Sequence, residues 1–398
     1  MIKKVLLVSF DVFPDVYPGA LRTINLAKAF CDAGYECKIG AAEIRLNNKY
    51  MPTGFKLSIS RNDIYSVSEY LGYKGSKYKR AIRNLILGGI RLSKWTEKEI
   101  SKGNVGAVIV SAKNSFLPSI LRGRLRKSSV PLIFDVVEWP EPNQYLLGTF
   151  GPWHLQGEYN FRHVFPKANG VITISSYLYE HFRELNENVI KIPPLIDIKD
   201  EKWNMDISNC ESKELTQFVF FGNIGRKDDI IMPIIAIDIL SRKKEKIKLK
   251  IIGSDQYGII KKFLSDNRYK KNIEYIGILP HNKTIENLLC SEYSIIFRPD
   301  RRYSRAGFPT KFVESLAAGV PVISNITSDI GDYLVDKENG FVIPEYSLRA
   351  LCIKLEESCT VDFYSRIRMK HNAKKTAEYK FDYRNYIDTV KSFLSKYL

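Results

Sequence analysis

The sequence lacks any run of about 20 apolar residues, the length that a membrane-spanning helix needs. Its opening stretch, MIKKVLLVSFDVFPD, resembles a secretory signal, but Asp11 and Asp15 interrupt the apolar run and no small-residue cleavage site follows. We therefore interpret the opening stretch as a first buried strand and expect a cytoplasmic protein.

Metal-binding patterns are also missing. The six cysteines form no CxxC pair and no spacing with histidine that is typical of zinc, so we expect buried free thiols. No DxD pair lies in a suitable loop, and we expect neither a metal nor a cofactor. The histidines are scattered and are interpreted as surface or core residues: His154, His163, His181, His281 and His371.

Two common nucleotide-binding signatures are absent. The loop after the first apolar run, FDVFPDVYPGA, contains no GxGxxG, which argues against a dinucleotide-dependent oxidoreductase. No GxxxxGK[ST] occurs anywhere, which excludes a P-loop kinase.

What the 398 residues do contain is an alternation of strand-length apolar runs with helical patterns, typical of βαβ units and parallel sheets. The polar, proline-containing stretch 191–214 is the best linker, and each side of it carries five expected strands. We predict two doubly wound α/β domains facing each other across a cleft, with ligands at the carboxyl ends of the strands. The expected strands are 3–10, 36–42, 106–112, 130–138, 170–175, 216–223, 247–253, 273–279, 293–298 and 320–324.

The chain is strongly basic, with a formal net charge of +17, and therefore suits an anionic partner. Residues 74–95 hold seven Lys or Arg and no acid, interleaved with apolar residues and ending in Trp95, and 121–127 adds four more bases. This composition is typical of a helix at an anionic membrane surface, although a solvated helix face explains it too. We see no nucleic-acid module and expect no nucleic acid as a partner.

The stretch Arg305–Ser324 predicts a helix that starts after Pro309 and ends at Gly319. Thr310 is expected to cap it, and the bend at Gly307 and Phe308 is expected to leave its first amides open. Helix amino-termini bind anions, so we predict a diphosphate site here, with Lys311 adding a positive charge.

Glu314 lies about one turn deeper in the same helix, about 6 Å below the first amides at a rise of 1.5 Å per residue. That gap is close to the separation of a nucleotide's diphosphate from its ribose. A carboxylate accepts hydrogen bonds from both ribose hydroxyls, so one helix would bind phosphate and sugar together. A solvent-facing glutamate on an amphipathic helix is the alternative.

The segment GFPTKFVESLAAGVPVIS resembles the donor-binding signature of the family 4 glycosyltransferases, in which an acid, seven residues and a second acid precede AxxxGxPVI. Glu314 matches the second acid, and Ala306 stands in place of the first. The resemblance implies a GT-B fold, retention of the anomeric configuration and a nucleotide-sugar donor.

Further segments match the family in order across nearly the whole chain. The opening strand, loop and helix place Gly19 in a glycine loop and Arg22 on the first helical turn. QFVFFGNIGRKDDI matches the first strand and loop of the second domain, where the family usually has Arg directly after the glycine and Lys five residues later. Here those places hold Asn223 and Asp228. The donor-binding residues that the resemblance implies are Gly19, Arg22, Gly222, Asn223, Arg226, Lys227, Gly307, Phe308, Thr310, Lys311 and Glu314.

The segment PLIFDVVEWPEP resembles the DxxDxWP variant of some bacterial members. It places Asp135 and Glu138 at a strand's carboxyl end, where they would meet the acceptor hydroxyl. We expect these two acids and Lys311 to be the catalytic residues. Caps of the next loop are the alternative role for the two acids.

The resemblance assigns residues 1–195 to an acceptor-binding domain, onto which helix 380–398 packs back, and residues 196–379 to the donor-binding domain. The expected function is transfer from a nucleotide diphosphate sugar, by the family's habit a UDP-sugar, to a glycan or lipid-linked saccharide in bacterial surface polysaccharide or lipopolysaccharide synthesis. A nucleotide-sugar-binding protein without turnover and a basic nucleic-acid-binding protein remain as alternatives. The expected lipid-linked acceptor and the positive net charge of the chain together suggest that the protein lies at the inner face of the membrane as a peripheral protein.

Overall fold

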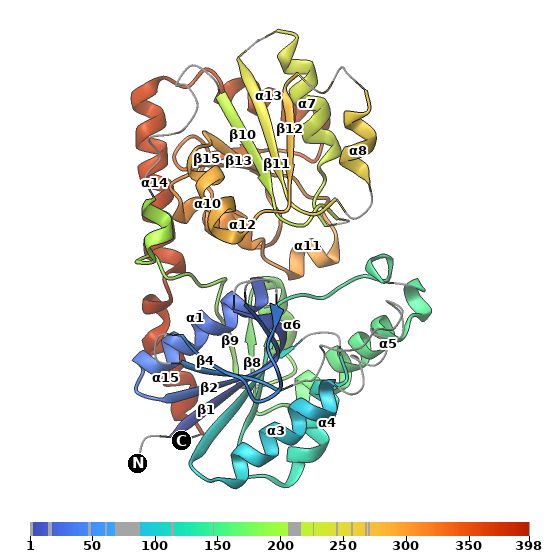
Figure 1. Cartoon of the computed structure of the whole chain (residues 1–398), viewed down its shortest axis with the longest axis vertical. Coiled ribbons are helices and arrows are strands. Elements are labelled where there is room, and N and C mark those ends of the chain that lie inside the picture. The colour runs from blue at the N-terminus through green and yellow to red at the C-terminus, as the bar shows by residue number, and fades with distance from the viewer. Residues whose placement is uncertain are drawn as a thin grey trace. The chain divides into compact units, whose positions relative to one another are not determined.

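The chain forms two units (Figure 1). Unit 1 comprises Met1–Leu195, Ala306–Phe308 and Tyr383–Leu398, and unit 2 comprises Ile196–Arg305 and Pro309–Asp382. The structure is a computed structural model, and it describes all residues except 1–2, 15–17, 47–48, 60–61, 68–87, 113–114, 146, 206–215, 226, 244–245, 256–257, 267–268, 270 and 398.

The core of unit 1 is a largely parallel sheet with the order β4-β5-β2-β1-β6-β7-β8-β9, with β3 paired to β2. All five strands expected in the first half are present. The short β3, β4, β5 and β9 were missed because each has only two to five residues and lacks a long apolar run. The strands are β1 (Lys4–Phe13), β2 (Glu36–Leu46), β3 (Lys49–Tyr50), β4 (Lys56–Ile59), β5 (Asn62–Ser66), β6 (Val105–Ala112), β7 (Leu132–Val136), β8 (Gly170–Thr173) and β9 (Val189–Lys191).

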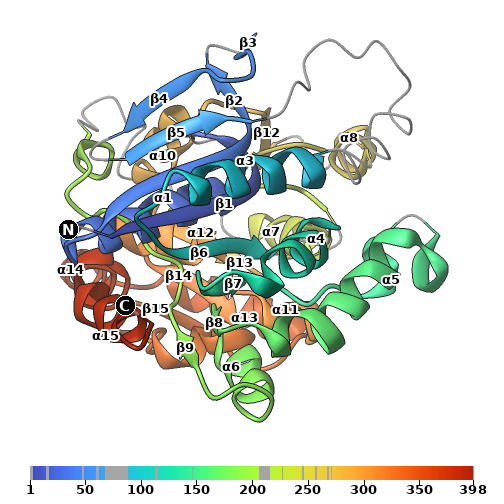
Figure 2. The same ribbon diagram turned by 90° about the horizontal axis from the view of Figure 1, so that it is seen from below.

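Helices cover both faces of this sheet, as expected where neighbouring strands are parallel and buried on both sides (Figure 2). On one face, the apolar side chains of α1 and α15 share a core with alternate residues of the central strands. On the other face, α3 packs against α4. The helices are α1 (Pro18–Asp32), α3 (Gly89–Ser101), α4 (Leu117–Arg124), α5 (Pro152–Tyr159), α6 (Ser176–Arg183) and α15 (Ile387–Ser395).

Unit 2 has a sheet in which every neighbouring pair is parallel, with the order β12-β11-β10-β13-β14-β15. All five strands expected in the second half are present, and β15 was missed. The strands are β10 (Thr216–Phe221), β11 (Ile247–Ile252), β12 (Ile273–Gly277), β13 (Tyr293–Ile296), β14 (Val322–Asn325) and β15 (Gly340–Ile343).

In unit 2, α7 packs against α13, and α12 packs against α14. The helices are α7 (Ile231–Ser241), α8 (Ile259–Leu264), α10 (His281–Leu289), α11 (Arg302–Ala306), α12 (Thr310–Ala317), α13 (Leu348–Ser358) and α14 (Phe363–Phe381). Two doubly wound α/β units are therefore confirmed. The placement of the two sheets across a cleft stays a prediction.

The return of the chain to unit 1 begins at Tyr383, where the sequence suggested residue 380. Tyr383 is buried and its hydroxyl donates to Asp32 at the end of α1, at 3.1 Å. The C-terminal helix α15 then contributes Val390, Phe393 and Leu394 to the core of unit 1.

Trp95 does not have the role that its place in the basic run suggested. Its ring lies so close to the backbone of Gly40 in β2 that a β-carbon built there would stand 2.5 Å from it, and the ring also contacts Tyr65. Trp95 is thus a packing residue between α3 and the sheet. Most of the basic run, residues 74–87, lies outside the described residues.

Cys31, Cys37, Cys352 and Cys359 are free thiols as expected, but of these four only Cys37 is buried and the others are half-buried. The expectation of a free thiol is wrong for Cys290, which is disulfide-bonded. Among the helices that the structure describes, none combines the length and hydropathy that crossing a bilayer requires.

Candidate functional site

The site in unit 2 lies where the strand order reverses. From β10 the chain proceeds to β11 and β12 on one side, and β13 begins the other half of the sheet directly beside β10. In doubly wound sheets, ligands bind at the carboxyl ends of strands at such a switch point. Gly222 follows β10 and Arg298 follows β13, so both lie at this edge of the sheet.

Three charged side chains meet there. The Lys311 ammonium lies 2.7 Å from Oδ2 of Asp228, and the Arg298 guanidinium donates through Nε to Oδ1 of the same carboxylate. All three residues are buried. The Lys311 ammonium also lies 4.4 Å from the ring centroid of Phe220, a cation–π distance.

These contacts decide the charge state of the cluster. Burial by itself raises the pKa of Asp228, but the charges of Arg298 and Lys311 outweigh burial, so this pKa lies well below its ordinary value. Burial lowers the pKa of Lys311, and the Asp228 carboxylate offsets only part of that effect. Asp228 is therefore an anion held between two cations.

Gly222 lets the backbone of the loop after β10 lie close to the Lys311 side chain. Its φ of +109° is a conformation that residues with a side chain rarely adopt, and a β-carbon built on it would stand 3.4 Å from Cε of Lys311. Its carbonyl oxygen lies so close to Gly253 that a β-carbon on Gly253 would overlap it at 1.7 Å. Two glycines thus allow the loops after β10 and β11 to touch.

Helix α12 starts within one residue of the prediction, but its cap differs. Pro309 is the N-cap residue, Thr310 is the first helical residue, and no side chain of the described residues caps this helix. The expectation that Thr310 caps it is wrong, because its side chain has entered the first turn. Gly307 and Phe308 precede the N-cap residue Pro309, and Phe308 is buried.

Glu314 is paired with a residue that the sequence analysis treated as ordinary. Nε2 of His281 lies 2.9 Å from Oε1 of Glu314, and the two side chains are 22% and 17% exposed. His281 is the first residue of α10, and Figure 1 shows α10 beside α12. In the local sequence, only Pro280 indicated that a helix begins at His281, because proline often precedes or opens a helix.

The other predicted donor-binding residues of the loop after β10 are Asn223, Arg226 and Lys227. The side chain of Asn223 is exposed, and so is that of Lys227. Arg226 lies outside the described residues. Arg298 was missed altogether, since nothing in its local sequence marks it as a partner of a loop 70 residues away.

In unit 1, two of the predicted site residues, Arg22 and Asp135, form an ion pair with each other. The Arg22 guanidinium contacts Asp135 through Nε and Nη2, with Nη2 at 2.7 Å from Oδ1. It also donates to the carbonyl oxygens of Ile192 and Pro193. Both charged residues are buried. This ion pair ties α1 to β7. The expected roles, diphosphate binding for Arg22 and proton transfer for Asp135, stay predictions.

Gly19 lies in the first turn of α1 and not in the expected loop. A β-carbon on Gly19 would stand 2.5 Å from Oδ2 of Asp11, so Gly19 lets α1 approach the end of β1 closely. The role of Gly19 in donor binding stays a prediction.

Glu138 follows β7 and is half-buried. Its neighbour Trp139 belongs to an aromatic cluster: its ring stacks on Phe161 at 4.6 Å and lies 4.6 Å from the ring of His181. The indole N–H of Trp139 donates to Glu158 at 3.0 Å. The tryptophan thus anchors the segment that carries Glu138.

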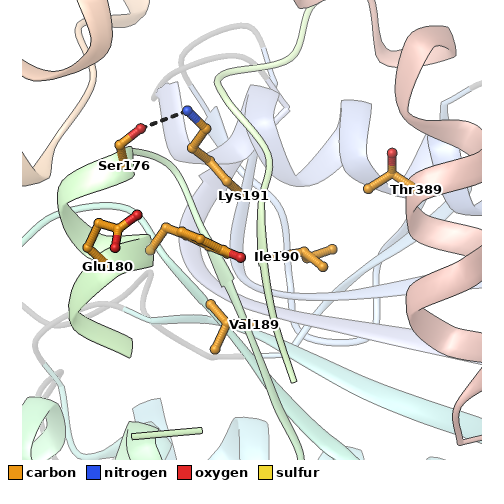
Figure 3. A pocket seen from close by; sticks show the side chains of 7 residues that line it. Ser176, Glu180, Val189, Ile190, Lys191 and Thr389 are labelled. Carbon is orange, nitrogen blue, oxygen red and sulfur yellow. Dashed lines mark hydrogen bonds between the residues drawn. The ribbon is translucent and has the colours of Figure 1, made fainter. Parts of the chain in front are cut away.

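A pocket of about 430 Å³ in unit 1 contains none of the predicted residues. In Figure 3 the Lys191 side chain points to Ser176, and its ammonium donates to the Ser176 hydroxyl at 2.8 Å. No group of three or more metal-ligating side chains occurs in the part of the chain that the structure describes. The lining residues are Ser176, Tyr179, Glu180, Val189, Ile190, Lys191 and Thr389.

Several solved structures are similar to the whole chain. Sucrose-phosphate synthase from Thermosynechococcus elongatus is 13% identical with a TM-score of 0.73, covering 99% of this chain and 98% of that one. Anabaena HepE in complex with UDP and glucose is 13% identical with a TM-score of 0.66, covering 99% of each chain. WaaG, a glycosyltransferase involved in lipopolysaccharide biosynthesis, is 12% identical with a TM-score of 0.67, covering 98% of this chain and 99% of that one.

No curated protein sequence matches the chain. Residues 201–376, which include α12 and the Asp228 cluster, match the family model described as glycosyl transferases group 1. The likeness to the solved structures, at such low identity, shows the fold. The chain therefore has the GT-B fold, and residues 201–376 match the glycosyl transferases group 1 family.

Proposed function

We propose that the chain is a glycosyltransferase that moves a sugar from a UDP-sugar to a glycan or lipid-linked saccharide, with retention of the anomeric configuration. One observation carries the proposal. At the switch point of unit 2, helix α12 begins without a side-chain cap and carries both Lys311 and Glu314. Arg298, which follows β13, contacts the Asp228 carboxylate that also pairs with Lys311. Residues 201–376 match a glycosyltransferase family, which supports the same function.

In this proposal the diphosphate binds at the first amides of α12, with Lys311 and Arg298 as the nearest cations. Arg298 supplies the guanidinium that the family pattern would place at Asn223. The ribose hydroxyls donate to Glu314. Of the UDP-binding neighbours, HepE was solved with UDP and with UDP-glucose, and this is the reason for preferring UDP.

The reaction breaks the bond between the anomeric carbon and the diphosphate oxygen, so negative charge develops on the leaving UDP. Fixed amides and cations stabilise such charge more in the transition state than in the ground state. The acceptor oxygen bonds to the anomeric carbon, and its proton passes to a base, for which Glu138 is our candidate. We propose no metal in this step, because Lys311, Arg298 and the helix amides supply the positive charge.

A thermal-shift panel of nucleotide sugars tests the donor. The correct donor at 100 times its Kd adds about 2.7 kcal/mol to the unfolding free energy, which is a clear rise in melting temperature. Glu314→Ala is expected to reduce the shift, and Glu286→Ala, at an exposed side chain of α10, is the control. A panel in which no nucleotide sugar stabilises the chain would count against the proposal.

Binding without turnover is the second candidate, favoured by Ala306, Asn223 and Asp228 at places where the family pattern has other residue types. Hydrolysis and transfer assays with the donor from the panel separate the two. Release of UDP that depends on an added acceptor supports transfer. Tight donor binding with no UDP release over hours supports the binding protein.

We also propose a peripheral cytoplasmic location at the inner face of a bacterial membrane, with surface polysaccharide or lipopolysaccharide synthesis as the setting. The net charge of +17 supports an anionic surface as partner. Sedimentation with anionic vesicles tests it, using Lys79→Glu, Arg80→Glu and Arg83→Glu together. Trp95→Phe is the matched control and should leave vesicle binding unchanged, because this ring packs on Gly40. Binding that survives the triple change would contradict the proposed surface.

A further inference from the structure

The His281–Glu314 pair joins two helices at the candidate site. The two residues are 33 positions apart in the sequence, and their hydrogen bond links the first residue of α10 to the middle of α12. Both side chains are partly exposed, so solvent reaches them. This arrangement differs from the buried Asp228 cluster, where all three charged residues are enclosed.

The geometry uses only part of the carboxylate. Oε1 of Glu314 receives the hydrogen bond from His281 at 2.9 Å, and a carboxylate has about four acceptor positions on its two oxygens. Oε2 therefore keeps its acceptor capacity for other donors. A neutral His281 that donates through Nε2 carries its proton there, which leaves Nδ1 as the unprotonated nitrogen.

The hydrogen bond also restrains rotation. The terminal torsion of a glutamate is broad, so an unrestrained carboxylate samples many orientations about its last bond. A fixed donor on Oε1 sets the plane of the carboxylate before any ligand arrives. Preorganisation of this kind raises affinity because less freedom is lost on binding.

We propose that His281 is a positioning residue that holds the Glu314 carboxylate in the orientation needed to accept hydrogen bonds from the ribose hydroxyls of the nucleotide. The inference rests on the proposed function, since it needs a ribose at Glu314. It adds a residue that touches Glu314, and it predicts that the effect of His281 depends on the ribose hydroxyls.

Isothermal titration of the full chain with UDP and with 2′,3′-dideoxy-UDP tests this dependence. The wild type is expected to bind UDP at least tenfold more tightly than the dideoxy analogue. His281→Ala should weaken UDP binding about tenfold and change dideoxy-UDP binding by less than twofold. His281→Gln, whose amide nitrogen reaches about as far as Nε2, should recover most of the UDP affinity.

Two measurements separate positioning from a structural role. In a Glu314→Ala background, His281→Ala should have no further effect on UDP binding, because the pair is already broken. Lys283→Ala, on an exposed part of α10, is the control for the helix. If His281→Ala proves too unstable to titrate, His281→Asn, which is too short to reach Oε1, replaces it with the same expected loss.

The outcomes distinguish this inference from the proposed function. If the wild type binds UDP and dideoxy-UDP equally, the ribose contact of Glu314 fails and the role of His281 falls with it. If the wild type prefers UDP and His281→Ala keeps the same preference, only the role of His281 is overturned. Equal weakening of both ligands by His281→Ala also overturns it, since that is the result of a structural contact.

Discussion

Oδ2 of Asp228 lies 2.7 Å from the Lys311 ammonium. Lys311, which was predicted to bind a diphosphate, therefore already has a counterion within the protein. The family pattern has a lysine at the place of Asp228, and here the sign of that charge is inverted. Arg298 from the end of β13 contacts the same carboxylate. Two cations and one anion leave the cluster with a net charge of +1.

Replacing Asp228 by asparagine is expected to destabilise the fold by about 3 kcal/mol, because two buried cations lose their shared counterion. Pyrophosphate should restore part of this loss, since it supplies the missing negative charge. Melting temperatures with and without pyrophosphate measure both effects.

Asp300→Asn is the matched control for this change. Asp300 also pairs with an arginine, Arg305, but both side chains are more than half exposed, so little stability is expected to be lost. An equal rise in melting temperature with pyrophosphate for the wild type and Asp228→Asn would contradict the prediction.

The stability that Asp228 provides should depend on pH in the acidic range. Its pKa in the folded chain lies well below the ordinary value of about 3.9, because the charges of Arg298 and Lys311 outweigh burial. A group with a lowered folded pKa contributes fully above its unfolded pKa, and the contribution is lost as pH falls towards the folded pKa.

The difference in unfolding free energy between the wild type and Asp228→Asn is therefore expected to be constant above about pH 5 and to shrink below about pH 4. Urea denaturation across this range measures it. A difference that instead grows on acidification would show that Asp228 is protonated in the folded chain.

Lys311→Met should separate phosphate binding from nucleoside binding. Methionine matches lysine as far as Cε and lacks only the ammonium, and the change leaves Asp228 paired with Arg298, so the fold should persist. We expect UDP affinity to fall tenfold or more, about 1.4 kcal/mol or more, while uridine affinity stays the same. Titrations with both ligands test it, with Lys283→Met on the exposed side of α10 as control.

An equal loss of UDP and uridine affinity in Lys311→Met would show that the lysine supports the loop rather than the phosphate. Unchanged UDP affinity would move the diphosphate away from the start of α12.

Asp135→Asn is expected to destabilise unit 1 by about 3 kcal/mol, because the buried Arg22 guanidinium loses its anion. Chemical denaturation measures the loss. The double change Arg22→Met with Asp135→Leu should recover much of the stability, as removal of a whole buried pair often does. Normal stability of Asp135→Asn together with lost turnover would instead support the catalytic role that the sequence suggested.

The ten expected strands and the start of α12 were predictable because their signals are local. A strand buried on both faces needs a continuous apolar run, as in Phe218–Phe221, and Ile247–Ile252 alternates buried apolar residues with lysines at the period of a strand. Gly34 and Gly319 end their helices with φ of +100° and +67°, which few other residues adopt. The short β3 was missed because it has only two residues, and β4 was missed because a partly exposed edge strand has a weak apolar pattern.

The sequence by itself therefore determined the two α/β units, the helix that carries Lys311 and Glu314, and the family resemblance. Only the tertiary structure decided the partners of these residues: Asp228 for Lys311 across 83 positions, His281 for Glu314 across 33, and Asp135 for Arg22 across 113. Local periodicity contains no information on which loops converge. That depends on the strand order, which brings the ends of β10 and β13 together and sets the charge of the site.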